Sequence, residues 1–257
     1  MHNWGVILNQ NSNQNKAVFL VVGSDTGVGK TVFSGLLGGY ISNIGLRFPL
    51  VKPFCSGGTK DIEFLKAANC YDPPSKVNYW YDDEPISPAA WELSSGDKIN
   101  FDDIVQELRQ VCKSDNFDIM LIEGVGGLLA PITQKLTVAS LGKEFGANLI
   151  IIAKNRVGVI NHVLLTVEAA LNRGLLVVSV ILMEQEEPDT SSTYNAELIR
   201  MHLPKMLNFK GVFEFPFLGK DADNPELISI NVKKVEIILE KIFDEVINPF
   251  VLLDSNN

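Results

Sequence analysis

The sequence has few cysteines, no excess of basic residues and no long apolar run, and each absence argues against a class of protein. Its three cysteines, Cys55, Cys70 and Cys112, are widely spaced and form no C-x-x-C or Cys/His ligand pattern, so neither a disulfide framework nor a zinc site is predicted. With 22 Lys and Arg against 31 Asp and Glu, the net charge is −9. We therefore expect no binding to nucleic acid and no electrostatic attraction to a membrane surface.

Signals for export or membrane insertion are also missing from the sequence. No run reaches the roughly 18 apolar residues of a membrane-spanning helix, and residues 1–16 lack a basic start followed by a long apolar stretch. Residues 9–16 are almost all Asn and Gln, which is typical of a polar extension. We expect a cytoplasmic protein with an N-terminal polar extension over residues 1–16, one domain over residues 17–247 and a C-terminal tail over residues 248–257.

The strongest positive signal is a strand, a glycine turn and a helix start near the N-terminus. Residues 18–22 are apolar without polar alternation, which is typical of a strand buried on both faces of a parallel sheet. Gly27 and Gly29 allow the following turn to point its backbone N–H groups inward. Lys30 can then reach the β and γ oxygens of a nucleotide, and the Thr31 hydroxyl can ligate Mg²⁺. The stretch predicts a phosphate-binding loop.

The glycine turn departs by one residue from the general pattern G-x-x-x-x-G-K-[ST]. That pattern would place a glycine at position 24, where Ser24 stands, and the nearest glycine is Gly23. A chance G-K-T within an ordinary turn is the alternative interpretation. Because strand, turn and helix occur in the order that a nucleotide-binding loop requires, we favour nucleotide binding.

Strands and helices alternate along the rest of the chain. Apolar runs bounded by Gly, Pro or polar residues predict strands, and apolar residues at helical spacing predict helices. The expected strands lie near residues 48–52, 118–123, 149–153, 175–183 and 211–218, and the expected helices near residues 31–44, 101–113, 137–145, 161–172, 193–207 and 228–247, with an excursion over residues 71–100. This pattern predicts a single α/β domain with a doubly wound, mostly parallel sheet and helices on both faces.

Three charged side chains stand at positions where α/β proteins bind ligands. Lys52 ends a predicted strand, Asp61 opens the next helix, and Glu123 ends a fully apolar strand that leads into a glycine-rich turn. The carboxyl ends of parallel strands meet at one edge of a sheet, so Glu123 can supply an Mg²⁺-side acid near Thr31. Plainer interpretations remain open: a solvated surface lysine, an Asp that caps its helix and a structural Glu.

Six short stretches, taken together, match one enzyme family. They are residues 23–31 (GSDTGVGKT), 52–57 (KPFCSG), 84–88 (EPISP), 123–127 (EGVGG), 160–166 (INHVLLT) and 214–218 (EFPFL). In this order and at nearly this spacing they resemble dethiobiotin synthetase, over a span from about residue 18 to residue 235. Members of that family also have one more residue between the two glycines of the first turn than the general pattern has.

The resemblance implies a homodimeric P-loop NTPase-like ligase that makes dethiobiotin from 7,8-diaminopelargonic acid and CO₂ in the biotin pathway, with ATP as co-substrate and Mg²⁺ as cofactor. One substrate amine captures CO₂ as a carbamate, ATP phosphorylates the carbamate, and the second amine attacks the mixed anhydride and releases phosphate. Carbamate and phosphate are anions, so cations and hydrogen-bond donors must stand where negative charge develops.

The resemblance also assigns roles to individual residues. The expected catalytic residues are Lys52, which stabilises the carbamate, Lys30, which contacts phosphate and carbamate, and Thr26. The expected Mg²⁺ ligands are Thr31, Asp61 and Glu123. Substrate contacts are expected from Ser56 and, across the dimer interface, from Gly158, Val159, Ile160 and Asn161. Nucleotide contacts are expected from Gly27, Val28, Gly29, Lys30, Thr31, Val32, Asp61, Glu123, Gly124, Gly126, Met183, Pro216, Phe217, Leu218 and Glu226.

Two points stay open at this level. Met183 stands where the family usually offers an Asn that reads adenine, so the preferred nucleotide base is not predicted. The alternative functions are a partition or septum-site ATPase, which would carry a signature lysine at the position of Asp25, and an inactive relative that only binds nucleotide. The acidic net charge disfavours the first, and the lysines and carboxylates assigned above disfavour the second.

Overall fold

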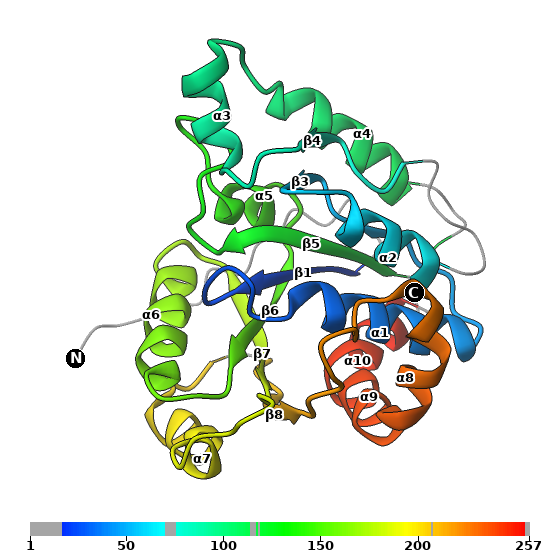
Figure 1. Cartoon of the computed structure of the whole chain (residues 1–257), viewed down its shortest axis with the longest axis vertical. Helices are drawn as coiled ribbons and strands as arrows, with labels where there is room; N and C mark the ends of the chain where they lie inside the picture. The colour runs from blue at the N-terminus through cyan, green and yellow to red at the C-terminus, as the bar shows by residue number, and fades with distance from the viewer. Residues whose placement is uncertain (1–16, 70–75, 114–116, 118, 207, 255–257) are drawn as a thin grey trace.

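The computed structural model describes residues 17–69, 76–113, 117, 119–206 and 208–254, and the predicted N-terminal extension lies outside them. Figure 1 shows a central sheet with helices on both faces. Its six strands run in the order β2-β5-β1-β6-β7-β8 and are β1 (Ala17–Gly23), β2 (Leu50–Val51), β5 (Ile119–Gly127), β6 (Asn148–Lys154), β7 (Leu176–Met183) and β8 (Gly211–Phe215). Their described pairings are all parallel, which confirms the predicted doubly wound α/β fold.

The two faces of β1 contribute to two separate hydrophobic cores because side chains alternate along a strand. Val18, Leu20 and Val22 belong to the first core, and Phe19 and Val21 belong to the second. The first core is covered by α4 (Phe101–Lys113), α5 (Val138–Glu144), α6 (Val159–Leu171) and α7 (Ser192–His202), and the second by α1 (Lys30–Asn43), α2 (Lys60–Ala68), α8 (Ile228–Lys234) and α9 (Glu236–Ile242). The central strand is therefore buried on both faces, as its uninterrupted apolar run predicted.

Glycines on α1 allow neighbouring helices to approach it closely. A Cβ atom on Gly35 would lie 2.2 Å from the ring of Phe64 in α2, and one on Gly39 would lie 3.0 Å from Val232 in α8. Glycine destabilises a helix by about 1 kcal/mol relative to alanine, but at these two positions the neighbouring helices leave little room for a side chain. The close packing fixes the N-terminus of α1 at the carboxyl edge of the sheet.

The predicted excursion contributes a helix and one strand of a small two-stranded sheet. β3 (Phe54–Ser56) pairs in parallel with β4 (Trp80–Asp82), a pairing that was not predicted from the sequence. α3 (Pro88–Ser95) follows β4, and at its start the Ser87 hydroxyl accepts a hydrogen bond from the Ala90 amide at 3.2 Å. Trp80 and Trp91 join the two elements through an edge-to-face contact with ring centroids 5.7 Å apart.

The C-terminal segment differs from the single helix predicted over residues 228–247. It forms η1 (Pro225–Leu227), α8, α9, a π-helical turn over Phe243–Ile247 and α10 (Asn248–Asp254). The break falls at Val235, whose ψ of 17° leaves helical geometry; its side chain is buried, and α8 and α9 then both pack against α1. Phe250 of α10 meets Phe19 of β1 at 5.4 Å between ring centroids. Among the described residues, no helix combines the length and apolar character that crossing a bilayer requires.

Candidate nucleotide and magnesium site

The loop between β1 and α1 presents backbone N–H groups at a helix start. Gly27 and Gly29 have φ angles of +66° and +97°, which glycine adopts without the steric cost of a side chain. The Phe33 amide donates to the Gly29 carbonyl at 3.0 Å, so the amides of the three residues before Phe33 point out of the helix end. Together with the positive end of the helix dipole, these amides form a site for an anion such as phosphate.

Gly23, the glycine that stands one residue early for the general loop pattern, occupies a crowded position. A Cβ atom there would lie 2.3 Å from the carbonyl oxygen of Asp25, 2.9 Å from that of Gly126 and 3.1 Å from Lys30 Nζ. The loop therefore folds back over the end of β1 and places the Lys30 ammonium against the backbone. A side chain at position 23 would push this arrangement apart.

The register of the sheet brings together the ends of three strands, and two of these ends carry a charged group. Val21 of β1 pairs with Glu123 of β5, and Val51 of β2 pairs with Ile122. Lys52, which follows Val51 directly, therefore lies beside Glu123. This placement is the one expected when parallel strands end at the same edge of a sheet.

Glu123 is the centre of a buried hydrogen-bond cluster. Its side chain is fully buried, and Oε1 accepts hydrogen bonds from Lys52 Nζ at 2.8 Å and from the Thr31 hydroxyl at 2.8 Å. Lys52 also forms an ion pair with Asp61, whose side chain is 38% exposed. Oε2 of Glu123 is buried and has no hydrogen-bond partner within the described part of the chain. A buried carboxylate oxygen without a partner can still coordinate a cation or accept a hydrogen bond.

The two lysines of the site experience opposite electrostatic environments. Burial by itself lowers the pKa of Lys52, but the adjacent carboxylates of Glu123 and Asp61 outweigh it and raise that pKa above its ordinary value of 10.5. Burial lowers the pKa of Lys30, and the attraction of Glu123 only partly opposes this shift. Lys52 is therefore held in its charged form, while Lys30 forms no ion pair with any of the described residues and gains most from a bound anion.

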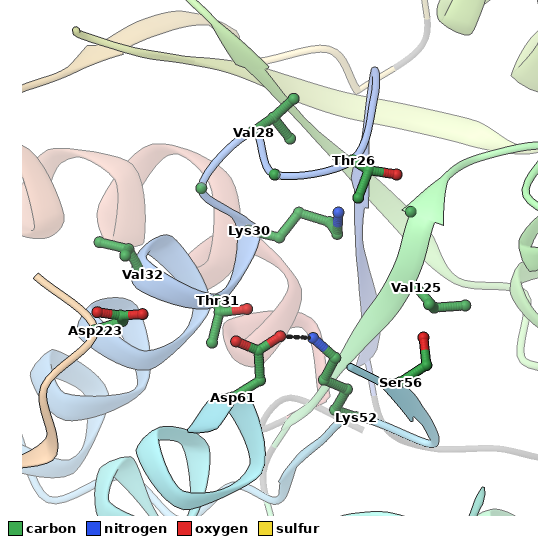
Figure 2. Close-up of a pocket in the computed structure, with 13 residues that line it drawn as sticks. Thr26, Val28, Lys30, Thr31, Val32, Lys52, Ser56, Asp61, Val125 and Asp223 are labelled. Atoms are coloured by element: carbon green, nitrogen blue, oxygen red, sulfur yellow. Dashed lines mark hydrogen bonds and ion pairs between the residues drawn. The ribbon is translucent and has the colours of Figure 1, made fainter. Parts of the chain in front are cut away.

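These groups surround a cavity of about 300 Å³ at the carboxyl edge of the sheet. Figure 2 shows Lys30, Thr31, Lys52 and Asp61 around it, with Thr26 and Ser56 toward one end and Asp223 toward the other. Its lining consists of Thr26, Gly27, Val28, Gly29, Lys30, Thr31, Val32, Lys52, Ser56, Asp61, Val125, Gly126 and Asp223. The volume falls at the lower end of the range for small-molecule sites.

The donor set fits magnesium bound together with phosphates. Thr31, Asp61 and Glu123 supply a hydroxyl and two carboxylates, and the unpartnered Oε2 of Glu123 offers an acceptor to a cation. Among the described residues, no group of three or more His, Cys, Asp or Glu side chains could hold a metal by itself. Mg²⁺ is commonly held by one or two carboxylates plus substrate phosphates, so this sparse set suits an ion that arrives with a nucleotide.

Comparison with known proteins identifies the family. A family model described as an AAA domain matches residues 17–220. The chain is 34% identical to "ATP-dependent dethiobiotin synthetase BioD" of Anaeromyxobacter sp. (strain Fw109-5) over 188 residues, which cover 70% of this chain and 83% of that protein. The chain belongs to the dethiobiotin synthetase family. A second member, from Methanocaldococcus jannaschii, is 30% identical over 169 residues, which cover 64% of this chain and 78% of that protein.

Membership of the dethiobiotin synthetase family confirms the resemblance drawn from the six stretches and makes the chain an enzyme of the ligase class. With a solved structure of the MinC:MinD cell division protein complex from Aquifex aeolicus, the chain shares 12% sequence identity and a TM-score of 0.49, over 93% of this chain and 95% of that chain.

The remaining residues assigned to nucleotide contact by the dethiobiotin synthetase resemblance lie outside the lining of the cavity. Met183 ends β7 and is buried, with its Cε atom 3.1 Å from the position of a Cβ on Gly29. Phe215, its partner in β8, is followed by residues 216–218, of which Phe217 is 41% exposed. Gly124 is buried beside Val138, and Glu226 is exposed in η1. Met183 thus lies against Gly29 of the phosphate-binding loop, and residues 216–218 follow the end of the adjacent strand. Their contact with a base stays a prediction.

The residues expected to receive the substrate carboxylate begin α6. Gly158 is the N-cap with a φ of 90°, and residues 159–161 form the first turn. A second, small hollow of about 10 Å³ lies beside them and is lined by Ser24, Asp25, Val28, Lys154, Arg156, Val159 and His162. Asp189 fixes the preceding loop, because its Oδ2 accepts from the Val157 amide at 2.8 Å and its Oδ1 accepts from the Ser191 amide at 2.9 Å. The start of α6 is therefore anchored to the loop that follows β7.

Two residues line the cavity without having been predicted. Val125 lies within the glycine-rich motif that follows Glu123, and its place between Glu123 and Gly126 is a signal that could have found it. Asp223 follows Asp221 and precedes Asn224 in a turn, where Asp and Asn are ordinary. Only tertiary folding brings Asp223 to the cavity, so local sequence holds no signal for it.

Proposed function

We propose that this chain is an ATP- and Mg²⁺-dependent dethiobiotin synthetase that carboxylates 7,8-diaminopelargonic acid with CO₂ and closes the ureido ring of dethiobiotin in biotin biosynthesis. The observation that carries the proposal is Lys52, a buried lysine held between Glu123 and Asp61 beside the phosphate-binding loop. Because its pKa is raised, Lys52 stays protonated across the neutral pH range. It offers a fixed positive charge where two anions must meet.

The reaction forms two C–N bonds to the carbon of CO₂. One amine of the substrate attacks CO₂ and loses a proton, which gives a carbamate. A carbamate oxygen then attacks the γ-phosphorus of ATP, and the bond between that phosphorus and the ADP oxygen breaks. The second amine attacks the carbamoyl carbon and loses a proton, while the C–O bond to phosphate breaks and phosphate leaves. Negative charge develops first on the carbamate and then on the transferred phosphoryl group.

The residues around the cavity match this charge development. Lys52 would stabilise the carbamate, and Lys30 would contact both the carbamate and the phosphate beside the backbone amides of the loop. The hydroxyls of Thr26 and Ser56 line the same end of the cavity, where they can donate to the bound substrate. Magnesium held by Thr31, Asp61 and Glu123 would offset the charge of the nucleotide phosphates.

The proposal includes a homodimer in the cytoplasm with the active site at its interface. The first turn of α6 would receive the substrate carboxylate of the neighbouring subunit through the backbone N–H groups at this helix N-terminus. Val157 and Leu165, before and within this helix, are 75% and 56% exposed. Exposed apolar side chains at and beside this helix favour contact with a partner surface.

The decisive experiment measures nucleoside diphosphate release by the purified protein with Mg²⁺, bicarbonate and 7,8-diaminopelargonic acid, each omitted in turn. Release that requires the diamine, bicarbonate and nucleotide together, with dethiobiotin detected by mass spectrometry, would support the proposal. Hydrolysis without the diamine would instead favour an ATPase switch. Binding without release would favour an inactive relative. ATP, CTP and GTP should be compared in parallel, because Met183 leaves the base preference open.

A further inference from the structure

The cavity ends on one side at an ion pair that the proposed chemistry does not use. Lys60, the first residue of α2, donates from Nζ to Oδ1 of Asp223 at 2.8 Å, across 163 positions of the sequence. Asp223 lines the cavity. Its side chain is 25% exposed and that of Lys60 is 63% exposed. The carboxylate thus borders the cavity, while the lysine lies mostly in solvent.

The direction of the phosphate-binding loop indicates which part of a nucleotide would reach Asp223. The lysine of such a loop contacts the β and γ phosphates, and Figure 2 shows the Lys30 ammonium pointing toward Thr26. Val32 and Asp223 lie on the opposite side of the helix start. A nucleotide with its terminal phosphates near Lys30 would therefore extend its α-phosphate and sugar toward Val32 and Asp223.

The Asp223 carboxylate stands at the edge of a site for anionic phosphates, where its negative charge would repel them unless it were neutralised. Lys60 supplies the counter-charge, since its ammonium neutralises Asp223 without entering the lining of the cavity. An ionised Asp accepts hydrogen bonds at both oxygens, and Oδ1 is the one that Lys60 uses. Carboxylates accept hydrogen bonds from ribose hydroxyls in other nucleotide-binding folds. Oδ2 can therefore accept from a hydroxyl of a sugar placed at this end.

The backbone around Asp223 is held by its neighbours. The Asn224 amide donates to the Asp221 carbonyl at 2.9 Å, and Asn224 Oδ1 accepts from the Glu226 amide at 3.0 Å as the cap of η1. The element η1 packs against α2 and α8. Asp223 is thus set between a closed turn and a capped helix start, which lowers the entropic cost of presenting its carboxylate.

We propose that Asp223 is a nucleotide-binding residue that accepts a hydrogen bond from a ribose hydroxyl, and that Lys60 is the positioning residue that holds and neutralises its carboxylate. The inference rests on the proposed function, because it requires a nucleotide in the cavity. It goes further by giving the site a preference for ribonucleotides over nucleotides that lack the sugar hydroxyls.

Calorimetric titration of the full chain with ATP and with 2′,3′-dideoxy-ATP, both with Mg²⁺, tests this preference. We expect wild type to bind ATP about 10-fold more tightly, which corresponds to about 1.4 kcal/mol. Asp223→Ala should bring the ratio of the two dissociation constants to about 1, because loss of the hydroxyl acceptor affects ATP alone, while the unpaired Lys60 charge affects both nucleotides alike. Asp221→Asn is the matched control on the same turn, and it should keep the wild-type ratio. A ratio measured on one preparation does not depend on its folded fraction.

Lys60→Met tests the positioning role separately. Without the ammonium, the Asp223 carboxylate would repel the phosphates, so both nucleotides should bind more weakly at low salt. Raising the ionic strength should reduce this loss, because salt screens exposed charges. A loss that is independent of salt would contradict the neutralising role.

The outcomes separate this inference from the proposed function. If wild type binds both nucleotides equally, or if Asp223→Ala keeps the wild-type ratio, ribose reading by Asp223 is overturned while nucleotide binding stands. If Asp223→Ala weakens both nucleotides equally, the residue acts on the phosphates or the fold, and the inference is also wrong. If wild type binds neither nucleotide, the proposed function fails with it.

Discussion

Replacing Lys52 with methionine should destabilise the protein strongly, because Glu123 would lose its counter-charge. The Lys52 side chain is 6% exposed and that of Glu123 is 0% exposed, with Nζ and Oε1 at 2.8 Å. Removing one partner of a buried pair typically costs about 3–5 kcal/mol, since the other charge is left buried and unpaired. Asp61 adds little to this figure, because its side chain is 38% exposed and contacts water.

The double variant Lys52→Met/Glu123→Gln should recover much of the loss. With both charges removed, no unpaired ion stays in the core, so the two single effects should not add. We expect a coupling of at least about 2 kcal/mol between the two sites. Mg²⁺ should also stabilise Lys52→Met more than wild type, because the ion can take the place of the ammonium beside the carboxylates.

Equilibrium unfolding in urea measures these differences. With a slope of about 3 kcal/mol per molar urea for a domain of this size, a loss of 3–5 kcal/mol lowers the midpoint by about 1–1.7 M. Lys76→Met is the matched control, because Lys76 pairs with Glu107 at the surface with side chains 45% and 46% exposed, and it should change stability by at most about 1 kcal/mol. Additive single effects, or a loss below about 1 kcal/mol for Lys52→Met, would refute the buried-pair argument.

Three further changes test the loop and its surroundings. Lys30→Ala should weaken ATP affinity by about 10- to 100-fold in calorimetry, because a charge-assisted hydrogen bond is lost; an unchanged affinity would contradict the phosphate role. Gly23→Ala should destabilise the fold by about 1–3 kcal/mol in urea, because its Cβ would lie 2.3 Å from the Asp25 carbonyl oxygen; unchanged stability would show that the loop is free to shift. The Ser191 hydroxyl and the Val157 amide lower the pKa of Asp189 below its ordinary value of 3.8, so wild type should be more stable than Asp189→Asn above that pH. The difference should vanish as the pH falls through the lowered pKa, and a constant difference would contradict the assignment.

The fold was largely predictable because its signals are local. An uninterrupted apolar run such as residues 149–153 indicates a strand buried on both faces, and the glycine turn after β1 sets the first helix. The break at Val235 was missed because an amphipathic pattern continues through it. The β3–β4 pairing was missed because it joins two segments of three residues each that lie far apart in the sequence, and only tertiary packing makes such short strands stable.

The site residues at strand ends could be predicted from the sequence. The residues that distant contacts bring to the site could not. Lys52 and Glu123 were expected at one edge of the sheet, and the structure places them in contact. Their mutual ion pair and the unpartnered oxygen of Glu123 follow from burial, which sequence patterns do not report. Asp223 lines the cavity and pairs with Lys60, 163 positions away, and no pattern around it indicates such a role.

The pairing of Val21 with Glu123 and of Val51 with Ile122 has a consequence for how much this protein can vary. The spacing between its acid and its lysine is set by rungs of a hydrogen-bonded ladder, so connecting loops can lengthen or shorten without altering that spacing. Insertion of a single residue within β5 before Glu123 would have the opposite effect. It would rotate the carboxylate to the other face of the sheet, against the first core, and remove the acid from the site at once. Tolerance to insertion should therefore change abruptly at the strand boundaries.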